Sequence, residues 1–180
     1  YPEIALQKIL LLNANASDIV PLRKWPMESF VELGKKLLKY AEITIIITGS
    51  EAEQQECEVL SRTINPDRVI NFSGKTSFKE LITLYSISDL LITNDSGPVH
   101  FASTTDIPIL ALFGPETPKI FGPMSPNAEV ISKELACSPC ISVFNQKRSS
   151  CNDNQCMKQI SVKMVLNEAK KFLGNETKKA

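Results

Sequence analysis

The chain has 180 residues, of which 43% are hydrophobic and 22% are charged, and its 20 Lys and Arg residues balance 20 Asp and Glu residues. A chain of this length predicts one domain that buries roughly two-thirds of the surface it exposes when unfolded. The apolar content excludes wholesale disorder, and the zero net charge argues against a nucleic-acid binder held by phosphate contacts. The richest apolar run, residues 43–47, is much shorter than the roughly 18 residues of a membrane span.

The first residues and the distribution of the cysteines indicate what kind of protein the chain comes from. Tyr1-Pro2-Glu3 has neither an initiator Met nor the layout of a signal peptide, so we interpret the chain as one domain of a longer protein. Cys57 is the single cysteine of the first 130 residues, and the other four lie within 20 residues. A secreted disulfide scaffold would be stapled throughout, so this distribution favours the reducing cytosol.

In chain order, the first elements alternate short apolar runs with helical patterns. Residues 9–12 predict a buried strand, followed by a polar loop over 13–18. Trp25-Pro26 opens a helix, because Pro suits the first helical position, and apolar residues then recur at helical spacing through Tyr40. The next strand is expected over residues 43–48.

The middle of the chain repeats this alternation. A polar helix is predicted over 51–64 and a strand over 69–72. Ser77 and Glu80 form a capping box that begins the next helix. A fourth strand is expected over 90–93, with a short helix after it from Pro98.

The last third is less regular. Strands are predicted over 109–113 and 129–131, separated by a proline-rich stretch over 114–126 that predicts an irregular loop. A final helix over about 161–173 ends at Gly174, and residues 175–180 are expected to fray.

Strands every 20–30 residues with helices between them indicate right-handed crossovers and a parallel sheet. The strands are almost wholly apolar, which is typical of strands covered on both faces. The predicted fold is therefore α/β, a Rossmann-like parallel sheet with helices on both faces. We expect a single domain over 1–180, with a Cys-rich loop at 136–157.

Ligands of such sheets bind outside the carboxyl ends of the strands. The loops expected there, 13–18, 49–53, 74–77, 94–97 and 114–117, are rich in Gly, Asn, Ser or Thr. None matches a dinucleotide or P-loop fingerprint, which disfavours those two classes of ligand.

The most informative loop is Asn94-Asp95-Ser96-Gly97, which joins a strand to the helix from Pro98. Free amides at a helix start suit a phosphate or diphosphate, and Gly97 lets the backbone approach it. Asp95 suits sugar hydroxyls, although an Asp here also caps helices. His100, the only histidine, either fills a partly buried position or helps to position the same ligand.

Two further groups of residues have alternative interpretations. Arg23 and Lys24 precede a helix, where they would neutralise a diphosphate or simply remain solvated, and Trp25 is interpreted as a packing anchor. Four thiols with the spacing C-x2-C-x10-C-x4-C are compatible with structural zinc, two disulfides or reduced cysteines: Cys137, Cys140, Cys151 and Cys156. A catalytic thiol is disfavoured, because His100 is the sole candidate base.

Four stretches together resemble the bacterial ADP-heptose:lipopolysaccharide heptosyltransferases, glycosyltransferase family 9, and specifically their C-terminal half. They are Arg23-Lys24-Trp25-Pro26, Asn94-Asp95-Ser96-Gly97 with His100, Ala111-Leu112-Phe113-Gly114-Pro115, and Cys137-Ser138-Pro139-Cys140 with Cys156-Met157.

The resemblance implies one half of a GT-B enzyme, namely the domain that binds the nucleotide-sugar donor for an inverting transfer that needs no metal. The lipopolysaccharide-core acceptor and the catalytic base would belong to an N-terminal domain outside this chain. A cytoplasmic location is implied, with peripheral contact at the inner face of the inner membrane compatible with it. A non-catalytic nucleotide-sugar binding module and half of a sugar-nucleotide epimerase are the alternatives.

Loop position and the resemblance together predict twelve substrate-binding residues. Arg23 would meet the donor phosphate and sugar, Glu53 the nucleoside, and Thr76 the base pocket. Two departures from the family pattern are Asn15, in a loop that usually holds a glycine, and Glu116-Thr117, where the family often has Thr-Asp. The full predicted set is Asn13, Asn15, Arg23, Lys24, Gly49, Glu53, Lys75, Thr76, Asp95, Ser96, Gly97 and His100.

Overall fold

Six parallel strands form one sheet in the computed structural model of the protein, which describes residues 7–16, 20–40 and 42–174. The sheet order is β3-β2-β1-β4-β5-β6. Chain order therefore reverses between β1 and β4, as in doubly wound Rossmann-like folds. The strands are β1 (Lys8–Asn13), β2 (Ile43–Ile47), β3 (Val69–Asn71), β4 (Leu90–Asn94), β5 (Ile109–Phe113) and β6 (Ala128–Ser132).

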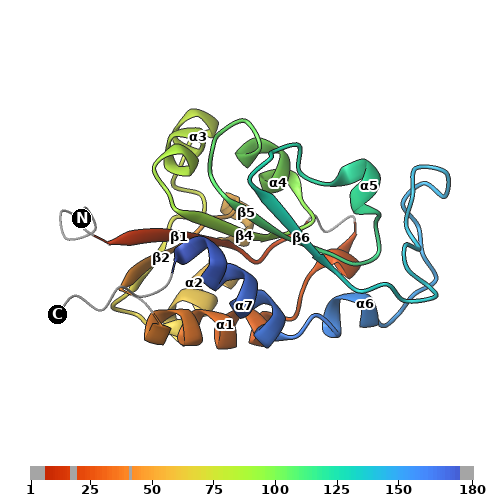
Figure 1. Ribbon diagram of the computed structural model, residues 1–180, viewed down its shortest axis with the longest axis horizontal. Coiled ribbons are helices and arrows are strands. Elements are labelled where there is room, and N and C mark those ends of the chain that lie inside the picture. Colours follow the sequence, from red (N-terminus) through yellow and green to blue (C-terminus); the bar gives the residue numbers. More distant parts are fainter. Residues whose placement is uncertain (1–6, 17–19, 41, 175–180) are drawn as a thin grey trace.

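Helices connect the strands and cover both faces of the sheet (Figure 1). Short 3-10 turns, η2 (Pro21–Arg23) and η3 (Glu51–Glu53), precede the first two helices. The α-helices are α1 (Met27–Tyr40), α2 (Gln54–Ile64), α3 (Phe78–Ser86), α4 (Gly97–Ala102), α5 (Pro118–Phe121), α6 (Gln155–Lys158) and α7 (Val162–Leu173).

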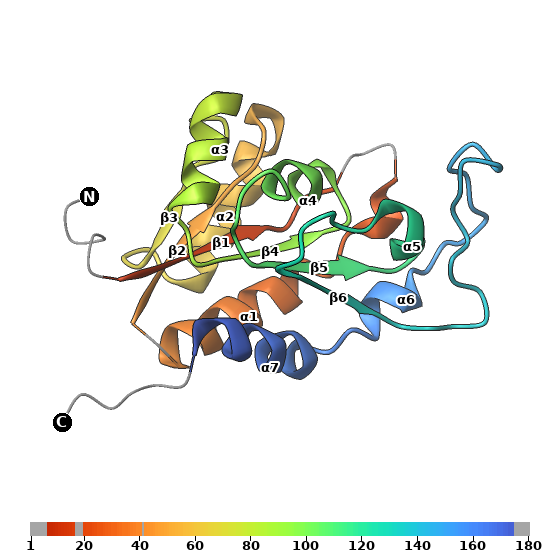
Figure 2. The same cartoon turned by 45° about the horizontal axis from the view of Figure 1, so that its top comes forward.

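Alternating side chains of the central strands divide the core into two layers. Leu10 and Leu12 of β1 pack with α1, α2 and α7, whereas Leu11 packs on the opposite face with α3 and α4. Figure 2 shows α1 and α7 side by side on one face, with α3 and α4 on the other. Burial on both faces explains why β2, β4 and β5 are buried throughout.

The predicted fold is confirmed, and the observed helices and strands differ from the predicted ones mainly at their ends. The capping box of α3 is present, with Ser77 N donating to Glu80 Oε2 at 2.8 Å and Glu80 N donating to Ser77 Oγ at 3.4 Å. The prediction of an irregular loop over 114–126 was wrong in part, because Thr117 and Pro118 begin the short helix α5. The expected fraying of 175–180 and part of the first loop, 17–19, lie outside the described residues.

The Cys-rich segment is tied to the carboxyl end of the sheet. Its Cys140 and Ile141 amides both donate to the carbonyl of Pro115, just after β5, at 2.9 Å each. Both views place this segment beside α5 and α6 (Figures 1 and 2). The loop therefore borders the edge where ligands of parallel sheets bind.

Within residues 7–16, 20–40 and 42–174, no helix has the length and apolar character needed to cross a membrane.

Candidate functional site

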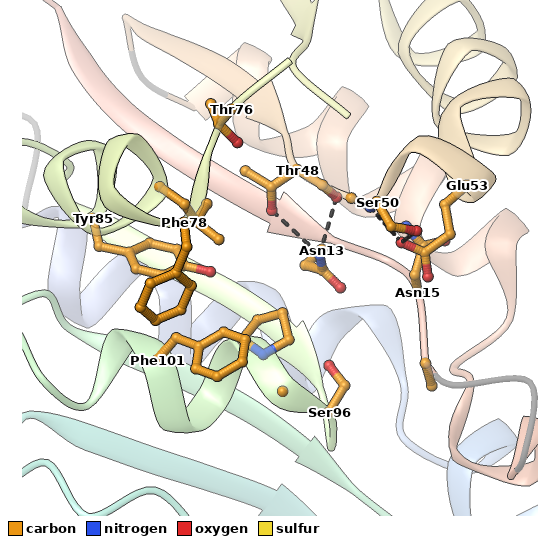
Figure 3. A pocket seen from close by; sticks show the side chains of 15 residues that line it. Asn13, Asn15, Thr48, Ser50, Glu53, Thr76, Phe78, Tyr85, Ser96 and Phe101 are labelled. Carbon is orange, nitrogen blue, oxygen red and sulfur yellow. Dashed lines mark hydrogen bonds between the residues drawn. The ribbon is translucent and has the colours of Figure 1, made fainter. Parts of the chain in front are cut away.

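A pocket of about 420 Å³ opens at the carboxyl ends of β1, β2 and β4 (Figure 3). It lies at the point where the strand order reverses, because Asn13 ends β1 and Ser96 follows β4. Its lining residues are Asn13, Asn15, Ala16, Thr48, Gly49, Ser50, Glu53, Thr76, Phe78, Leu81, Tyr85, Ser96, Gly97, Pro98 and Phe101.

One wall of the pocket is polar and held by hydrogen bonds. Asn13 Nδ2 donates to the Thr48 carbonyl at 3.0 Å and to Thr48 Oγ1 at 3.3 Å, which links the ends of β1 and β2. Glu53 Oε2 accepts from Ser50 N at 2.7 Å and from Ser50 Oγ at 2.9 Å. These bonds orient an amide and a carboxylate at the pocket before a ligand arrives.

Gly49 is required by the close approach of the loop after β2. A Cβ at this position would lie 2.9 Å from Asn15 Nδ2 and 3.0 Å from Cys57 Sγ. Asn15 Nδ2 in turn donates to Cys57 Sγ at 3.3 Å. Burial raises the pKa of the Cys57 thiol, so it stays protonated beneath this wall.

The opposite wall is aromatic. Phe78 of α3 and Phe101 of α4 meet edge to face with ring centroids 5.0 Å apart, and both are partly exposed (Figure 3). Tyr85 is fully buried, and its hydroxyl finds no hydrogen-bond partner among the described residues. Burial raises the pKa of Tyr85 far above its ordinary value, so this hydroxyl remains a neutral donor.

Asn94 holds the loops at this edge together. Its Nδ2 donates to the carbonyl of Ala14 at 2.8 Å, and its Oδ1 accepts from the Trp25 amide at 3.0 Å. Asn94 is fully buried, so its role is to position the loop of β1 and the start of α1 around the turn at Asp95. Trp25 is also buried, as its interpretation as a packing anchor predicts, and donates through Nε1 to the Ile160 carbonyl at 2.8 Å.

Beside the pocket, two cations and two carboxylates form a group that we call the charged cluster: Arg23, Asp95, Glu116 and Lys147. Arg23 Nη1 lies 3.7 Å from Asp95 Oδ2 and 3.5 Å from Glu116 Oε2. Lys147 Nζ lies 3.6 Å from Glu116 Oε1. Burial raises the pKa of Asp95 to about 6, because the favourable field of Arg23 offsets the desolvation of its carboxylate only in part.

The structure brings most of the predicted residues to one place. Seven of the twelve line the pocket: Asn13, Asn15, Gly49, Glu53, Thr76, Ser96 and Gly97. Arg23 and Asp95 lie in the adjoining charged cluster. The remaining three do not line the pocket: Lys24 contacts Glu56, Lys75 donates to the Asn71 carbonyl, and His100 is exposed on α4.

Four residues at the site are not among the predicted ones: Tyr85, Phe78, Phe101 and Lys147. The three aromatic residues sit in helical patterns whose apolar positions are ordinary core positions, so no signal in the sequence separates them. Lys147 comes from a loop whose position only the tertiary structure defines. The departure of Glu116 from the family pattern is a usable signal in the sequence.

The four clustered cysteines surround a separate cavity of about 260 Å³. They and Cys57 are free thiols, with Cys156 buried and Cys137 exposed. In the described part of the chain, no three or more His, Cys, Asp or Glu side chains are grouped so as to hold a metal ion.

Comparison with known proteins places the chain in a family. The model of glycosyltransferase family 9 (heptosyltransferase) matches residues 3–150. The chain belongs to glycosyltransferase family 9. The family 9 relative lipooligosaccharide heptosyltransferase 2 of Campylobacter jejuni is 32% identical over 175 residues, which cover 94% of this chain and 52% of the relative. The chain therefore spans about half the length of that heptosyltransferase.

Solved structures confirm the family 9 fold. The ADP-heptose heptosyltransferase II of Escherichia coli superposes with a TM-score of 0.77 at 22% identity, covering 94% of this chain and 47% of that chain. Escherichia coli heptosyltransferase WaaC, solved with ADP, gives a TM-score of 0.69 at 20% identity over 95% of this chain and 46% of that chain. The iron-containing glycosyltransferase TibC of Escherichia coli gives 0.68 at 13% identity over 94% and 46%.

Proposed function

We propose that this domain binds the nucleotide-sugar donor of an inverting glycosyltransferase that acts in lipopolysaccharide-core biosynthesis. The observation that carries the proposal is the pocket at the reversal point of the sheet, with one polar and one aromatic wall. A nucleoside needs both kinds of wall, because its base has apolar faces and its ribose has hydroxyl groups.

The nucleoside occupies the space between the two walls. Phe78 and Phe101 offer apolar area to the base, and the unpaired Tyr85 hydroxyl gains a hydrogen-bond partner. Glu53 uses Oε2 for Ser50, and Oε1 accepts from a ribose hydroxyl. Thr76, at the rim beside α3, borders the base.

The diphosphate extends from this pocket along the turn after β4. Ser96 is the N-cap of α4 and Gly97 is its first residue, and the first amides of a helix have no partner inside the helix. During inverting transfer the bond from the anomeric carbon to the diphosphate oxygen breaks, and negative charge grows on that oxygen. These amides stabilise the leaving group, and Arg23 adds the part of its charge that Asp95 and Glu116 leave uncompensated.

The other requirements of transfer lie outside this chain. We propose that a base on a further domain removes the proton of the acceptor hydroxyl. That domain would also bind the lipopolysaccharide-core acceptor, at the cytoplasmic face of the inner membrane. Transfer in this proposal uses no metal ion, as the family resemblance implies.

Calorimetric titration with ADP-, UDP- and GDP-sugars and the matching nucleoside diphosphates tests the proposal. ADP-D-β-D-heptose is the first ligand to try, since a solved TibC complex holds it and WaaC is solved with ADP. One nucleotide class is expected to bind, and the free nucleoside more weakly.

A blocking variant locates the site. A Cβ at Gly97 would lie 3.2 Å from Cε2 of Phe101, so Gly97→Val pushes a branched side chain against the aromatic wall. The affinity of Gly97→Val for the nucleoside diphosphate is expected to fall on the order of tenfold, because the added side chain takes up space that the ligand needs beside the turn. Thr83→Val, on the exposed side of α3, is the matched control. Failure of the whole panel to bind, or equal binding by both variants, contradicts the proposal.

A further inference from the structure

The charged cluster contains a carboxylate that the proposed nucleotide pocket does not use. Glu116 has a side chain only 1% exposed, and Asp95 one only 3% exposed. Arg23 and Lys147 are 12% and 39% exposed. Burying an ionised carboxylate is costly, so two of them side by side need compensation from their surroundings.

The compensation present is incomplete. The ion pairs of Glu116 measure 3.5 and 3.6 Å, well beyond the 2.7–2.9 Å of a charge-assisted hydrogen bond. Neither oxygen of Glu116 has a hydrogen-bond partner within the described residues, and the same holds for Asp95 Oδ2 and Arg23 Nε. The cluster thus has three unsatisfied acceptors and one unsatisfied donor.

The unsatisfied acceptors and donor indicate what kind of ligand group fits the cluster. The charges of the two cations and two carboxylates sum to zero, so the cluster has little net attraction for an anion. Buried acceptors without partners are instead satisfied by O–H or N–H donors. A polyhydroxylated group such as a sugar supplies several such donors without adding charge.

The charged cluster also lies where the sugar of a nucleotide-sugar bound in the pocket would extend. Asp95 directly precedes Ser96 and Gly97, which line the nucleotide pocket, and Glu116 follows the neighbouring strand β5. Asp95 Oδ2 and Glu116 Oε2 converge on one atom, Nη1 of Arg23. A ligand that runs from the pocket past the β4–α4 turn therefore meets two carboxylates together.

We propose that Glu116 is a specificity-determining residue for the donor sugar and accepts sugar hydroxyls beside Asp95, for which the sequence already suggests that role. The proposal rests on the proposed function, since the sugar enters as part of the nucleotide-sugar. Arg23 keeps the two carboxylates side by side.

Through Lys147, the Cys-rich segment contributes a side chain to the proposed sugar subsite at Asp95 and Glu116. Its ammonium lies over the Phe121 ring, 5.0 Å from the centroid, as well as next to Glu116. Gln146 and Lys147 have φ angles of 56° and 58°, a region that non-glycine residues seldom adopt. Lys147 is the most exposed member of the cluster, so the sugar reaches Glu116 from the side that this lysine covers.

The test compares one ligand pair on matched variants of the 180-residue chain. ADP-D-β-D-heptose and ADP are titrated calorimetrically into the parent, Glu116→Gln and the control Glu129→Gln, whose side chain is exposed on β6. Glu116→Gln keeps the shape and removes the charge. Affinity for the nucleotide-sugar is expected to fall on the order of tenfold, while ADP binds unchanged or tighter because two cations lose a counter-charge.

Other results overturn the inference. Equal weakening for ADP and for the nucleotide-sugar makes Glu116 a positioning residue for the diphosphate site. No change for either ligand removes Glu116 from the site, and a parent that binds ADP-D-β-D-heptose no tighter than ADP has no sugar subsite here. A parent that binds no nucleotide of the panel instead contradicts the proposed function itself. Glu116→Asp, which keeps the charge, replaces Glu116→Gln if thermal melting shows that the latter does not fold.

Discussion

Arg23 illustrates how a side chain's chemistry depends on neighbours that the sequence places far away. Its position after the first strand's loop predicts a cation that meets the donor phosphate. In the structure Asp95 and Glu116, more than 70 residues away in sequence, flank its guanidinium at 3.7 and 3.5 Å. Part of its charge is therefore compensated before any ligand binds. Replacing Arg23 would also leave the buried Asp95 carboxylate without a close cation and Glu116 with Lys147 alone.

Asp95 makes stability depend on pH. Its pKa is about 6 in the folded protein and near 3.8 when unfolded, so the folded state holds the extra proton between these values. Stability contributed by this group therefore falls as pH rises from about 4 to 6 and then stays constant. Asp95→Asn is expected to be more stable than the parent by roughly 1–3 kcal/mol at pH 7, with little difference below pH 4.

Urea unfolding at pH 4, 5, 6 and 7 measures this difference. Subtracting the parent from the variant removes the contributions of the other carboxylates. A difference that does not change with pH would show that Asp95 titrates normally in the folded protein.

Tyr85 carries a buried hydroxyl without a partner, which costs folding free energy. Tyr85→Phe is expected to raise the free energy of unfolding by about 1 kcal/mol and to weaken nucleotide binding, because the bound base loses a hydrogen bond. Tyr40→Phe is the control, since the Tyr40 hydroxyl donates to the Gly174 carbonyl at 3.2 Å and its loss does not stabilise the protein. Thermal melting and calorimetry measure the two effects; a destabilised Tyr85→Phe that binds normally contradicts the assignment.

At the scale of elements, the Cys-rich segment has one buried and one exposed end. Cys156, in α6, packs below the turn at Gly114, where an added Cβ would lie 2.9 Å from its Sγ. Cys137 is exposed. A thiol in the core behaves as a small apolar group, whereas an exposed thiol contributes little to packing.

Cys156→Ser is expected to lower the free energy of unfolding by about 1–3 kcal/mol, because it buries a hydroxyl in an apolar site. Cys137→Ser is expected to change it by less than about 0.5 kcal/mol. Nucleotide affinity should be the same in both variants. Equal destabilisation by the two substitutions would show that the thiols act as one unit, as a shared metal ion or a disulfide pair requires.

At the scale of the whole molecule, the described residues form one six-stranded Rossmann-like sheet with its helices, and the chain spans about half the length of the Campylobacter jejuni relative. We expect the 180 residues to fold and bind nucleotide, since the described residues form two core layers and the pocket. We expect no sugar transfer, because no side chain at the pocket is assigned as the base. A transfer assay with ADP-D-β-D-heptose and a lipopolysaccharide-core acceptor measures this, and turnover by the chain alone would contradict it.

The sequence by itself determined the layout of the domain. Buried parallel strands are continuous apolar runs, helix starts carry local signals such as the Ser77–Glu80 capping box, and both depend on neighbours close in the chain. Loops at the carboxyl ends of parallel strands must converge, so seven of the predicted residues meet at the pocket without further information.

Only the tertiary structure decided which side chains form ion pairs and which pack against each other. Glu116 and Asp95 follow adjacent strands, and Lys147 arrives from the Cys-rich segment, whose path depends on its bonds to Pro115. The aromatic wall likewise joins two helices through the Phe78–Phe101 contact. Local sequence patterns record neither kind of contact, because the interacting residues are brought together by packing of the sheet, the helices and one irregular loop.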